Sequence, residues 1–539
     1  MKRINVFVRR QRIKKLENLT IAAICAEAFL LAISPYAAAA VIVLGFFTYF
    51  LRLQIDRKFK LRSLPFDMPV TIFLLMGAVS VFMSLVRDFD LIYNYCGVVG
   101  VFFLTYLLVG QNIRKPEHVK ILAKSLAISA LLVVLYGYFQ YIFGIEISEI
   151  KWADAEAFPE LRRHVFSTFE NPNILAGYLD VMICLALGLL AKFGTKKQKL
   201  ILVAAILMLL ACLIMTHSHG AFLTAAIIFV IYGIFYDKRI LIFFALIAAI
   251  LFYNDANIIE EILSGFVASN DSSEILRSGI WVSTISMIAD HPFVGIGWGA
   301  FESVYPSYNY YLIDATQKIY HAHNLYLQTA AEVGIAGALA YFWYFFGTMF
   351  MALDLNSNER YSKMKNTAGE IAERASKSKF KQKFDEEFVK TFVESKFLQR
   401  LAQIKSMMIL RMSETINQIS DKFSKTPETK NKPKTVKKSE PELVHHEEMK
   451  WNKKSDKKET DDDKIDIQKF AAEIMSFESE ETKSDKKLAA GMKLGTGLAF
   501  LSMALNGITD NFLFYIPASI FMWMLGALAA AVSLFDEEN

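Results

Sequence analysis

The feature that most limits how this chain can fold is a series of apolar blocks, each about as long as a bilayer-spanning helix. A helix needs roughly 20 apolar residues to cross the hydrocarbon layer, and such blocks recur along most of the 539 residues. The mean hydropathy of +0.31 and the 54% of hydrophobic residues exclude an ordinary water-soluble domain. We therefore predict an all-α polytopic membrane protein with about twelve spans, at residues 19–34, 36–52, 66–86, 91–110, 117–143, 172–191, 198–215, 219–236, 239–253, 324–352, 488–505 and 511–535.

The lysines and arginines of the connecting loops predict the orientation of these spans. If the N-terminus lies in the cytoplasm, every short inner segment is basic and the outer segments carry few basic residues. This is the bias expected for cytoplasmic loops. It places both termini inside and the stretch HAHN, residues 321–324, at the outer face.

Composition divides the chain into three parts. Residues 1–353 hold the first ten spans and two long outer loops, 145–171 and 254–322, and residues 488–539 hold the last two spans. Residues 354–487 lie between them and are rich in Lys, Glu, Asp and Ser. Such a composition buries too little apolar surface to offset chain entropy. We expect this part to be a charged, partly disordered cytoplasmic insertion with no catalytic role.

Two histidines stand where the tenth predicted span begins. His323 lies next to the expected start of a helix, whose dipole disfavours imidazolium. A neutral histidine at a wet surface can accept a proton from a hydroxyl group. Asn324, Gln328 and Glu332 then form a polar stripe along the helix. A second stripe consists of small residues that allow close helix packing, namely Ala330, Gly334, Gly337 and Ala338. An interfacial role for both histidines, without chemistry, is the simpler alternative.

Arginines are scarce in the long outer loops, so those present carry information. Arg162 and Arg163 lie in the first loop and Arg277 in the second. A guanidinium group suits bidentate phosphate binding, although extension toward lipid headgroups is an alternative role. His219 opens a helix at the outer tip between the seventh and eighth spans. The stretch ENPN, residues 170–173, is expected to open another helix, with its first asparagine as the cap.

The second outer loop contains a predicted surface helix. Asp271 and the glutamate three residues later match a helix-start pattern. Trp281, Ile285 and Ile288 then share one helical face, with Arg277 one turn earlier. The helix is expected to stop in the stretch HPFVGIGWG, where a proline and three glycines break the periodicity.

One candidate base, several cations and helix N-termini on one face suit a lipid-linked pyrophosphate donor. In such a reaction a hydroxyl attacks a sugar and an anionic leaving group must be stabilised. A zinc site is less favoured, because no Asp or Glu adjoins the HAH stretch. Asp88 and Asp90 form an outer D-x-D pair, which leaves a metal-dependent transferase as a further alternative.

These motifs resemble those of the bacterial O-antigen ligases and the related Wzy-type O-antigen polymerases. His323 and Asn324 are followed after nine residues by Gly334 and after two more by Gly337, which matches the ligase pattern H-[NSQ]-x9-G-x2-[GTY]. Arg277, with a tryptophan four residues later and then HPFVGIGWGAF, is similar to the segment that precedes this pattern. FENPN and the S-x-G tip resemble two further landmarks of the family.

The resemblance implies a twelve-helix transferase of the bacterial inner membrane with its active site on the periplasmic face. It would join an undecaprenyl-pyrophosphate-linked glycan to a hydroxyl of a glycolipid or glycan acceptor, without metal, cofactor or nucleic acid. His323 would be the catalytic base and Arg277 would stabilise the leaving group. The expected substrate-binding residues are Arg162, Arg163, His219, Asn324 and His321. His219 departs from the pattern, because family members commonly carry arginine there.

A ligase is the favoured interpretation and a polymerase of the same fold is its nearest alternative, since the two differ in the acceptor. A transporter or flippase is a third alternative from a different class. It would place ionisable residues near the membrane midplane. Most ionisable residues here lie at the outer ends of spans, and Glu27 and Asp180 are the exceptions.

Overall fold

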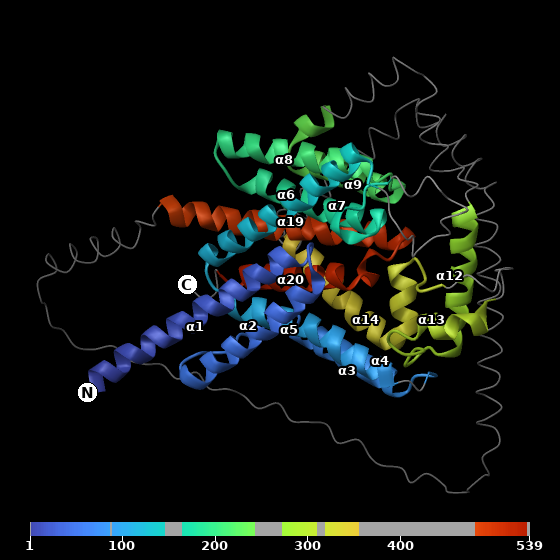
Figure 1. Ribbon diagram of the computed structural model, residues 1–539, viewed down its shortest axis with the longest axis horizontal. Coiled ribbons are helices and arrows are strands. Elements are labelled where there is room, and N and C mark those ends of the chain that lie inside the picture. The colour runs from blue at the N-terminus through green and yellow to red at the C-terminus, as the bar shows by residue number, and fades with distance from the viewer. Residues whose placement is uncertain are drawn as a thin grey trace, which may run out of the picture. The chain divides into compact units, whose positions relative to one another are not determined.

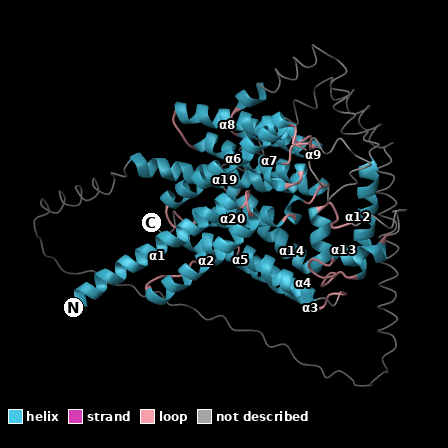
Figure 2. Cartoon of the chain, viewed as in Figure 1, coloured by secondary structure: helices cyan, strands magenta, loops and turns pink. Residues whose placement is uncertain are grey.

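The computed structural model of the chain describes residues 2–86, 89–145, 164–242, 272–309, 319–354 and 480–535. Within these residues all regular structure is helical, and no β-strand occurs among them (Figure 2). The helices long enough to name are α1 (Lys2–Leu30), α2 (Pro35–Ile55), α3 (Asp67–Phe82), α4 (Phe89–Asn94), α5 (Gly100–Asn112), α6 (Pro116–Phe143), α7 (Pro172–Lys192), α8 (Lys196–Met215), α9 (His219–Phe235), α12 (Ser272–Asp290), α13 (Phe301–Val304), α14 (Leu325–Leu353), α19 (Glu480–Thr509) and α20 (Ile516–Ser533). Shorter helical turns are η1 (Tyr95–Val99), η3 (Ser167–Phe169), η4 (Tyr305–Tyr308) and η5 (Phe512–Phe514).

The lengths and composition of these helices confirm a polytopic membrane protein. Eight described helices are long and apolar enough to cross a membrane: α2, the continuous stretch Phe89–Asn112, α6, α7, α8, α14, Glu481–Ile508 of α19, and α20. α3 and α9 are apolar but shorter. The predicted span at residues 19–34 falls on the second half of α1, and the one at 239–253 lies largely outside the described residues.

α19 extends beyond the predicted span on its N-terminal side. The span was expected to begin at residue 488, and the described helix already includes Glu480. Lys120 of α6 binds its first turns, with the ammonium nitrogen 3.1 Å from Glu481 and 3.0 Å from Asp485. The charged residues before the apolar block therefore extend the helix and connect it to α6.

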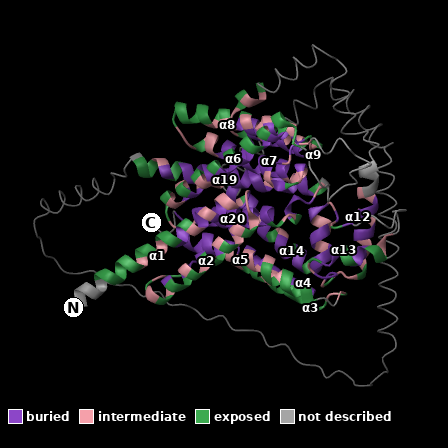
Figure 3. Ribbon diagram, in the orientation of Figure 1, coloured by how far each residue is buried: buried purple, intermediate pink, exposed green. Residues whose placement is uncertain are grey.

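Three helices form the centre of the packed core. Most residues of α7, α19 and α20 are buried, whereas fewer than a third of the residues in the apolar stretches of α2 and α8 are buried (Figure 3). Figure 1 shows α5 packed against α20 and α3 against α14, and both pairs are in contact. Gly188 of α7 meets Gly495 of α19 so closely that a Cβ on Gly188 would lie 2.2 Å from the Gly495 nitrogen. Such small residues let two helix backbones approach within a membrane.

Glu27 and Asp180, two acidic residues inside predicted spans, each have a partner on a neighbouring helix. Glu27 of α1 is fully buried and accepts a hydrogen bond from the Thr105 hydroxyl of α5. Asp180 of α7 accepts one from the Asn506 amide of α19, at 3.0 Å. An unpaired polar group is costly in hydrocarbon. Each bond satisfies one oxygen of its carboxyl group, whereas Oε2 of Glu27 and Oδ1 of Asp180 are buried without a hydrogen-bond partner among the described residues.

A kink in α14 corrects the expected role of one glycine. Gly334 was predicted to allow close helix packing, but it has φ 71° and ψ 173° and interrupts the helix. A Cβ there would lie 2.3 Å from the Phe293 carbonyl oxygen, so a loop, not a helix, occupies this space. Gly337 does approach another helix, because a Cβ on it would lie 3.2 Å from Met76 of α3.

The loop after α12 supplies the hydrogen bonds that the kink removes. The amide of Ile296 donates to the Ala331 carbonyl at 2.8 Å, and the amide of Ile335 donates to the Pro292 carbonyl at 2.8 Å. Gly297 donates to the Glu332 carbonyl at 3.2 Å. Buried backbone groups need such partners. The stretch that contains the proline and the glycines ends α12, as predicted. It also supplies hydrogen-bond partners for the backbone groups of α14 around the kink.

α12 packs against α14 through a face that the sequence pattern did not single out. Ile280, Ser283, Thr284 and Met287 are buried, while Trp281, Ile285 and Ile288 are only partly buried. The helix ends at Asp290, as expected. Its predicted position on the outer membrane surface stays a prediction.

Candidate active site

The segment His321–Asn324 leads directly into α14 and has a defined conformation. Asn324 is the N-cap, and its side-chain oxygen accepts a hydrogen bond from the Leu327 amide at 2.9 Å. Its side-chain nitrogen donates to the Ile508 carbonyl near the end of α19, also at 2.9 Å. His323 has φ 47°, in the left-handed region that histidine adopts more readily than most residues. The predicted helix start is confirmed, and Asn324 orients the segment by connecting two helices.

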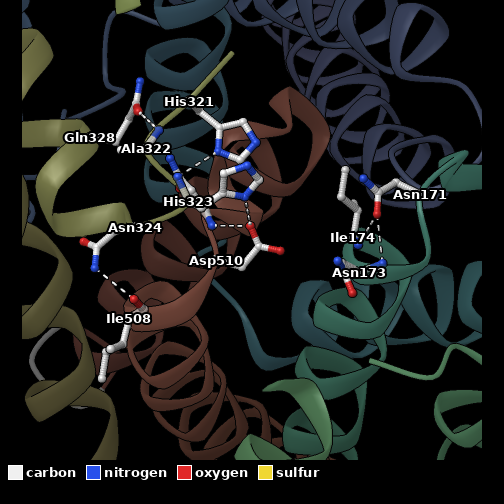
Figure 4. A network of polar contacts seen from close by, with 11 residues as sticks. Asn171, Asn173, Ile174, His321, Ala322, His323, Asn324, Gln328, Ile508 and Asp510 are labelled. Carbon is white, nitrogen blue, oxygen red and sulfur yellow. Dashed lines mark hydrogen bonds and ion pairs between the residues drawn. The ribbon is translucent and has the colours of Figure 1, made fainter. Parts of the chain in front are cut away.

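Asp510, just beyond α19, faces His323. Nδ1 of His323 lies 3.4 Å from Oδ1 of Asp510, although 187 residues separate them in sequence (Figure 4). About 31% of the His323 side chain and 29% of the Asp510 side chain are exposed. Solvent can therefore reach both side chains, and each side chain has the other as its partner.

His321 packs beside this pair and stays neutral. Its Nδ1 accepts a hydrogen bond from the His323 amide at 3.1 Å, and its ring centroid lies 4.0 Å from that of His323. Burial lowers the pKa of His321 to about 3, and the neighbouring charges of His323 and Arg277 act in the same direction. A neutral His321 that accepts at Nδ1 carries its proton on Nε2, so it can donate a hydrogen bond there.

The electrostatic environment of Asp510 keeps it ionised. Burial raises its pKa, but the hydrogen bond from His323 and the charges of His323, His321 and Arg277 outweigh burial, so the pKa lies below the ordinary range. Arg277 of α12 is partly buried and close enough for its charge to act on both His321 and Asp510. The charges of the two predicted catalytic residues, His323 and Arg277, therefore both act on a carboxylate that the sequence analysis did not identify.

A second set of hydrogen bonds supports the backbone between the two histidines. The amide of Ala322 donates to Oε1 of Gln328 at 2.7 Å (Figure 4). Nε2 of Gln328 donates to Oε1 of Glu332 at 2.9 Å. Gln328 and Glu332 are buried. The predicted polar stripe of α14 is thus present. Its Gln328 side chain holds the backbone of the HAHN segment through the hydrogen bond from Ala322.

The turn after Asp510 connects this cluster to the start of α7. Phe514 of η5 lies against His321, with ring centroids 4.6 Å apart. The ring of Phe512 lies so close to Gly177 of α7 that a side chain at Gly177 would clash with it. Asn171 caps α7 by accepting from the amides of Asn173 at 2.9 Å and Ile174 at 3.4 Å (Figure 4). The helix start predicted from ENPN is confirmed.

Other predicted site residues lie apart from this cluster or outside the described residues. His219 is the first residue of α9 and is exposed, while its neighbour His217 stacks on His164 with centroids 4.8 Å apart. Arg162 and Arg163 lie outside the described residues, so their binding role stays a prediction.

A metal site was less favoured in the sequence because no acidic residue adjoins the HAH stretch. The fold corrects this reason, since it brings Asp510 to the two histidines. Ligand atoms of His321, His323 and Asp510 lie within 4.8 Å of one another. In the alternative D-x-D pair, Asp90 is exposed on α4 and Asp88 lies outside the described residues.

Comparison with known proteins finds a similarity over part of the chain. The family model described as O-antigen ligase matches residues 203–342, which include α9, α12 and the first part of α14. The matched region therefore contains Arg277, His321, His323 and Asn324, but not Asp510. A search of curated proteins finds no match.

Proposed function

We propose, from the match of residues 203–342 to the O-antigen ligase family model, that the chain is a metal-independent membrane glycosyltransferase. It would join an undecaprenyl-pyrophosphate-linked glycan to a hydroxyl of a glycolipid or glycan acceptor. The observation that carries the proposal is the contact between Nδ1 of His323 and Oδ1 of Asp510, 3.4 Å apart at the start of α14. A histidine oriented by a carboxylate is the arrangement of a general base.

His323 would take the proton of the acceptor hydroxyl. With Nδ1 directed at Asp510, a hydrogen on Nδ1 leaves the lone pair of Nε2 available to the acceptor. The hydroxyl oxygen attacks the anomeric carbon, its proton passes to Nε2, and the bond from that carbon to the pyrophosphate oxygen breaks. The carboxylate of Asp510 then stabilises the imidazolium that forms.

The leaving pyrophosphate takes up the electron pair of the broken bond, so a nearby cation should stabilise it. Arg277 is suited to this role, because its positive charge acts on His321 and Asp510, which both contact the proposed base. His321 has a donor at Nε2, which suits it to bind a donor or acceptor oxygen. Asn324 would act by positioning the histidines, and Arg162, Arg163 and His219 would contribute further contacts to the donor.

The proposed reaction takes place on the periplasmic face of the bacterial inner membrane. The scarcity of Lys and Arg in the outer loops supports this placement of the site. A Wzy-type polymerase would use the same base and the same leaving group, and only the acceptor would differ. Profiling the glycans of a deletion strain separates the two: loss of all attached polymer indicates a ligase, whereas single attached units indicate a polymerase.

The proposal is tested by replacing His323. In membranes supplied with donor and acceptor, His323→Ala should reduce transfer roughly 100-fold or more, as loss of a general base typically does. Donor binding should change little, since the base does not contact the pyrophosphate. Asp510→Asn should lower the rate less, because the base remains but loses its ionic partner. His118→Ala, a change in α6 outside the cluster, is the control. Transfer by His323→Ala at near the wild-type rate would overturn the proposed mechanism.

A further inference from the structure

The geometry of the candidate base also fits a metal ion. Among the described residues, His321, His323 and Asp510 are the one group of three or more His, Cys, Asp or Glu residues whose ligand atoms converge, within 4.8 Å of one another. Zinc bonds to imidazole nitrogen and carboxylate oxygen measure about 2.0–2.2 Å, so ligands of a tetrahedral ion stand about 3.4 Å apart. Small side-chain rotations would bring all three ligands into range.

The donor atoms determine which ions would bind. Two imidazole nitrogens and one carboxylate oxygen leave a fourth position open, as in zinc sites with three protein ligands. Imidazole favours zinc, copper and nickel, whereas magnesium and calcium prefer sites made of oxygen atoms. His323 and Asp510 are both partly exposed, so an ion can reach them.

We propose that His321, His323 and Asp510 form a binding site for a Zn²⁺-like divalent transition-metal ion, and that the bound ion inhibits transfer. The inhibitory part rests on the function proposed above, whereas binding rests on the geometry of the three side chains alone.

Inhibition follows from the chemistry of the imidazole ring. An ion bound at Nδ1 of His323 leaves the ring hydrogen on Nε2, and an ion bound at Nε2 occupies that atom directly. In either case His323 has no free lone pair for the acceptor proton. The ion also takes the carboxylate of Asp510 away from the imidazole.

Two features make the ion exchangeable. Nδ1 of His321 accepts the His323 amide hydrogen bond at 3.1 Å, so a metal bond to this atom must replace an existing contact. The positive charge of Arg277 acts on both His321 and Asp510 and opposes a cation between them. Removing that charge should therefore tighten metal binding, although it should not improve transfer.

The binding test uses the purified full-length chain, stripped of metal and carrying an affinity tag without histidine. Titration with Zn²⁺, and with Co²⁺ as a visible-absorption probe, should give one ion for each chain. His321→Ala and Asp510→Asn should each weaken binding at least about 10-fold, a loss seen even for residues that only support metal ligands. Arg277→Gln should strengthen it. His217→Ala is the matched control, because His217 belongs to the other H-x-H pair, stacks on His164, and is part of no cluster with a described carboxylate.

The activity test separates the two parts of the proposal. Zn²⁺ should inhibit the wild-type chain, EDTA should restore its activity, and Mg²⁺ should have no effect. The residual activity of His321→Ala should be far less sensitive to Zn²⁺. Binding that survives both His321→Ala and Asp510→Asn overturns the site, and activation by Zn²⁺ overturns the inhibitory role. A chain without transferase activity that still binds one ion through these residues would refute the proposed function and leave the site intact.

Discussion

At the scale of single residues, the structure separates two histidines that look equivalent in the sequence. His323 faces the carboxylate of Asp510 and is partly exposed, so a proton that it receives has a counter-charge nearby. His321 packs beside His323, and burial keeps it neutral. The first therefore suits a base and the second a hydrogen-bond donor, even though only one residue lies between them.

The low pKa of His321 predicts how stability depends on pH. A histidine in an unfolded chain titrates near 6.5, whereas folding lowers the pKa of His321 to about 3. Between these values the unfolded chain binds a proton that the folded chain does not. The free energy of unfolding should therefore fall as pH decreases, by at most about 1.4 kcal/mol for each pH unit. Asp510, whose pKa folding lowers, adds to this loss only as pH falls toward the ordinary carboxyl pKa of about 3.9, so the range from pH 7 to pH 5 reports on His321.

The variant His321→Asn isolates this effect. Asparagine keeps an acceptor for the His323 amide but cannot take up a proton. Thermal unfolding of the purified chain should show that wild type loses more stability between pH 7 and pH 5 than His321→Asn does. His217→Asn, at an exposed histidine, should behave like wild type. Equal losses in wild type and His321→Asn would show that His321 is not held neutral by the fold.

Arg277 is predicted to act on the donor and not on the acceptor. Arg277→Ala should weaken donor binding and slow departure of the pyrophosphate, with a loss in transfer of roughly 100-fold, as for removal of one group that stabilises a developing anion. Arg277→Lys should recover only part of it, since lysine cannot make a bidentate contact. Steady-state kinetics with varied donor measures both effects, and Arg239→Ala at an exposed position is the control. Full activity of Arg277→Ala would remove this residue from the mechanism.

Sequence reasoning found the histidines because chemistry and local pattern coincide there. His323 lies at a helix start, and Asn324 supplies the cap that the pattern suggests. Asp510 left no comparable signal: it is one carboxylate in a turn, 187 residues away, and only packing of α19 against α14 brings it to His323. Residues that a fold brings together from distant elements cannot be recognised from spacing along the chain.

At the scale of elements, eight of the predicted spans fall on described helices that are long and apolar enough to cross a membrane, because bilayer thickness sets the length of such helices. The interruption of α14 was not predicted, since a glycine in an apolar helix more often allows packing than breaks the helix. Gly334 breaks it because the loop at Pro292–Gly297 supplies replacement hydrogen bonds. That loop comes from a distant part of the sequence, so local pattern again could not reveal the pairing.

The end of α19 that carries Asp510 is predicted to depend on Asn506. The Asn506 amide donates to Asp180 of α7 at 3.0 Å, and its oxygen accepts from the Thr224 hydroxyl of α9 at 2.9 Å. Asn506→Leu would leave both partners buried without this bond, which costs about 1–3 kcal/mol for each group. We expect a lower thermal midpoint and a reduced kcat with little change in KM, because Asp510 follows one turn later.

An exchange of the two partners tests whether this contact is specific. Asp180→Asn combined with Asn506→Asp retains one carboxyl and one amide at the same interface. The double variant should recover most of the activity and stability that Asn506→Leu loses. Failure of the exchange, together with full activity of Asn506→Leu, would show that the contact does not position Asp510.

At the scale of the whole molecule, the prediction with the widest consequences is the orientation in the membrane. Ser303 on α13 is exposed, and Ser439 belongs to the charged insertion. Cysteines can be introduced at each position in a Cys96→Ser background, because Cys96 is the exposed one among the four free cysteines. An impermeant thiol reagent added outside should label position 303 but not position 439. The reverse labelling would place the candidate active site in the cytoplasm.

The charged insertion is predicted to be dispensable for transfer. α14 ends at Leu353 and α19 begins at Glu480, so a linker need only connect these two helices. A Gly/Ser linker of about 20 residues has a root-mean-square reach of roughly 25 Å. Replacing residues 360–475 retains Glu481 and Asp485, which bind Lys120 at the start of α19.

Transfer in membranes should then remain close to the wild-type rate, because the proposed base, its carboxylate and the leaving-group cation all lie outside the replaced segment. A variant that removes the contact with Lys120 instead, Asp485→Asn, tests the helix start separately and should lower stability. If the linker chain folds and reaches the membrane at normal levels yet transfers nothing, the insertion takes part in the reaction and the site described here is incomplete.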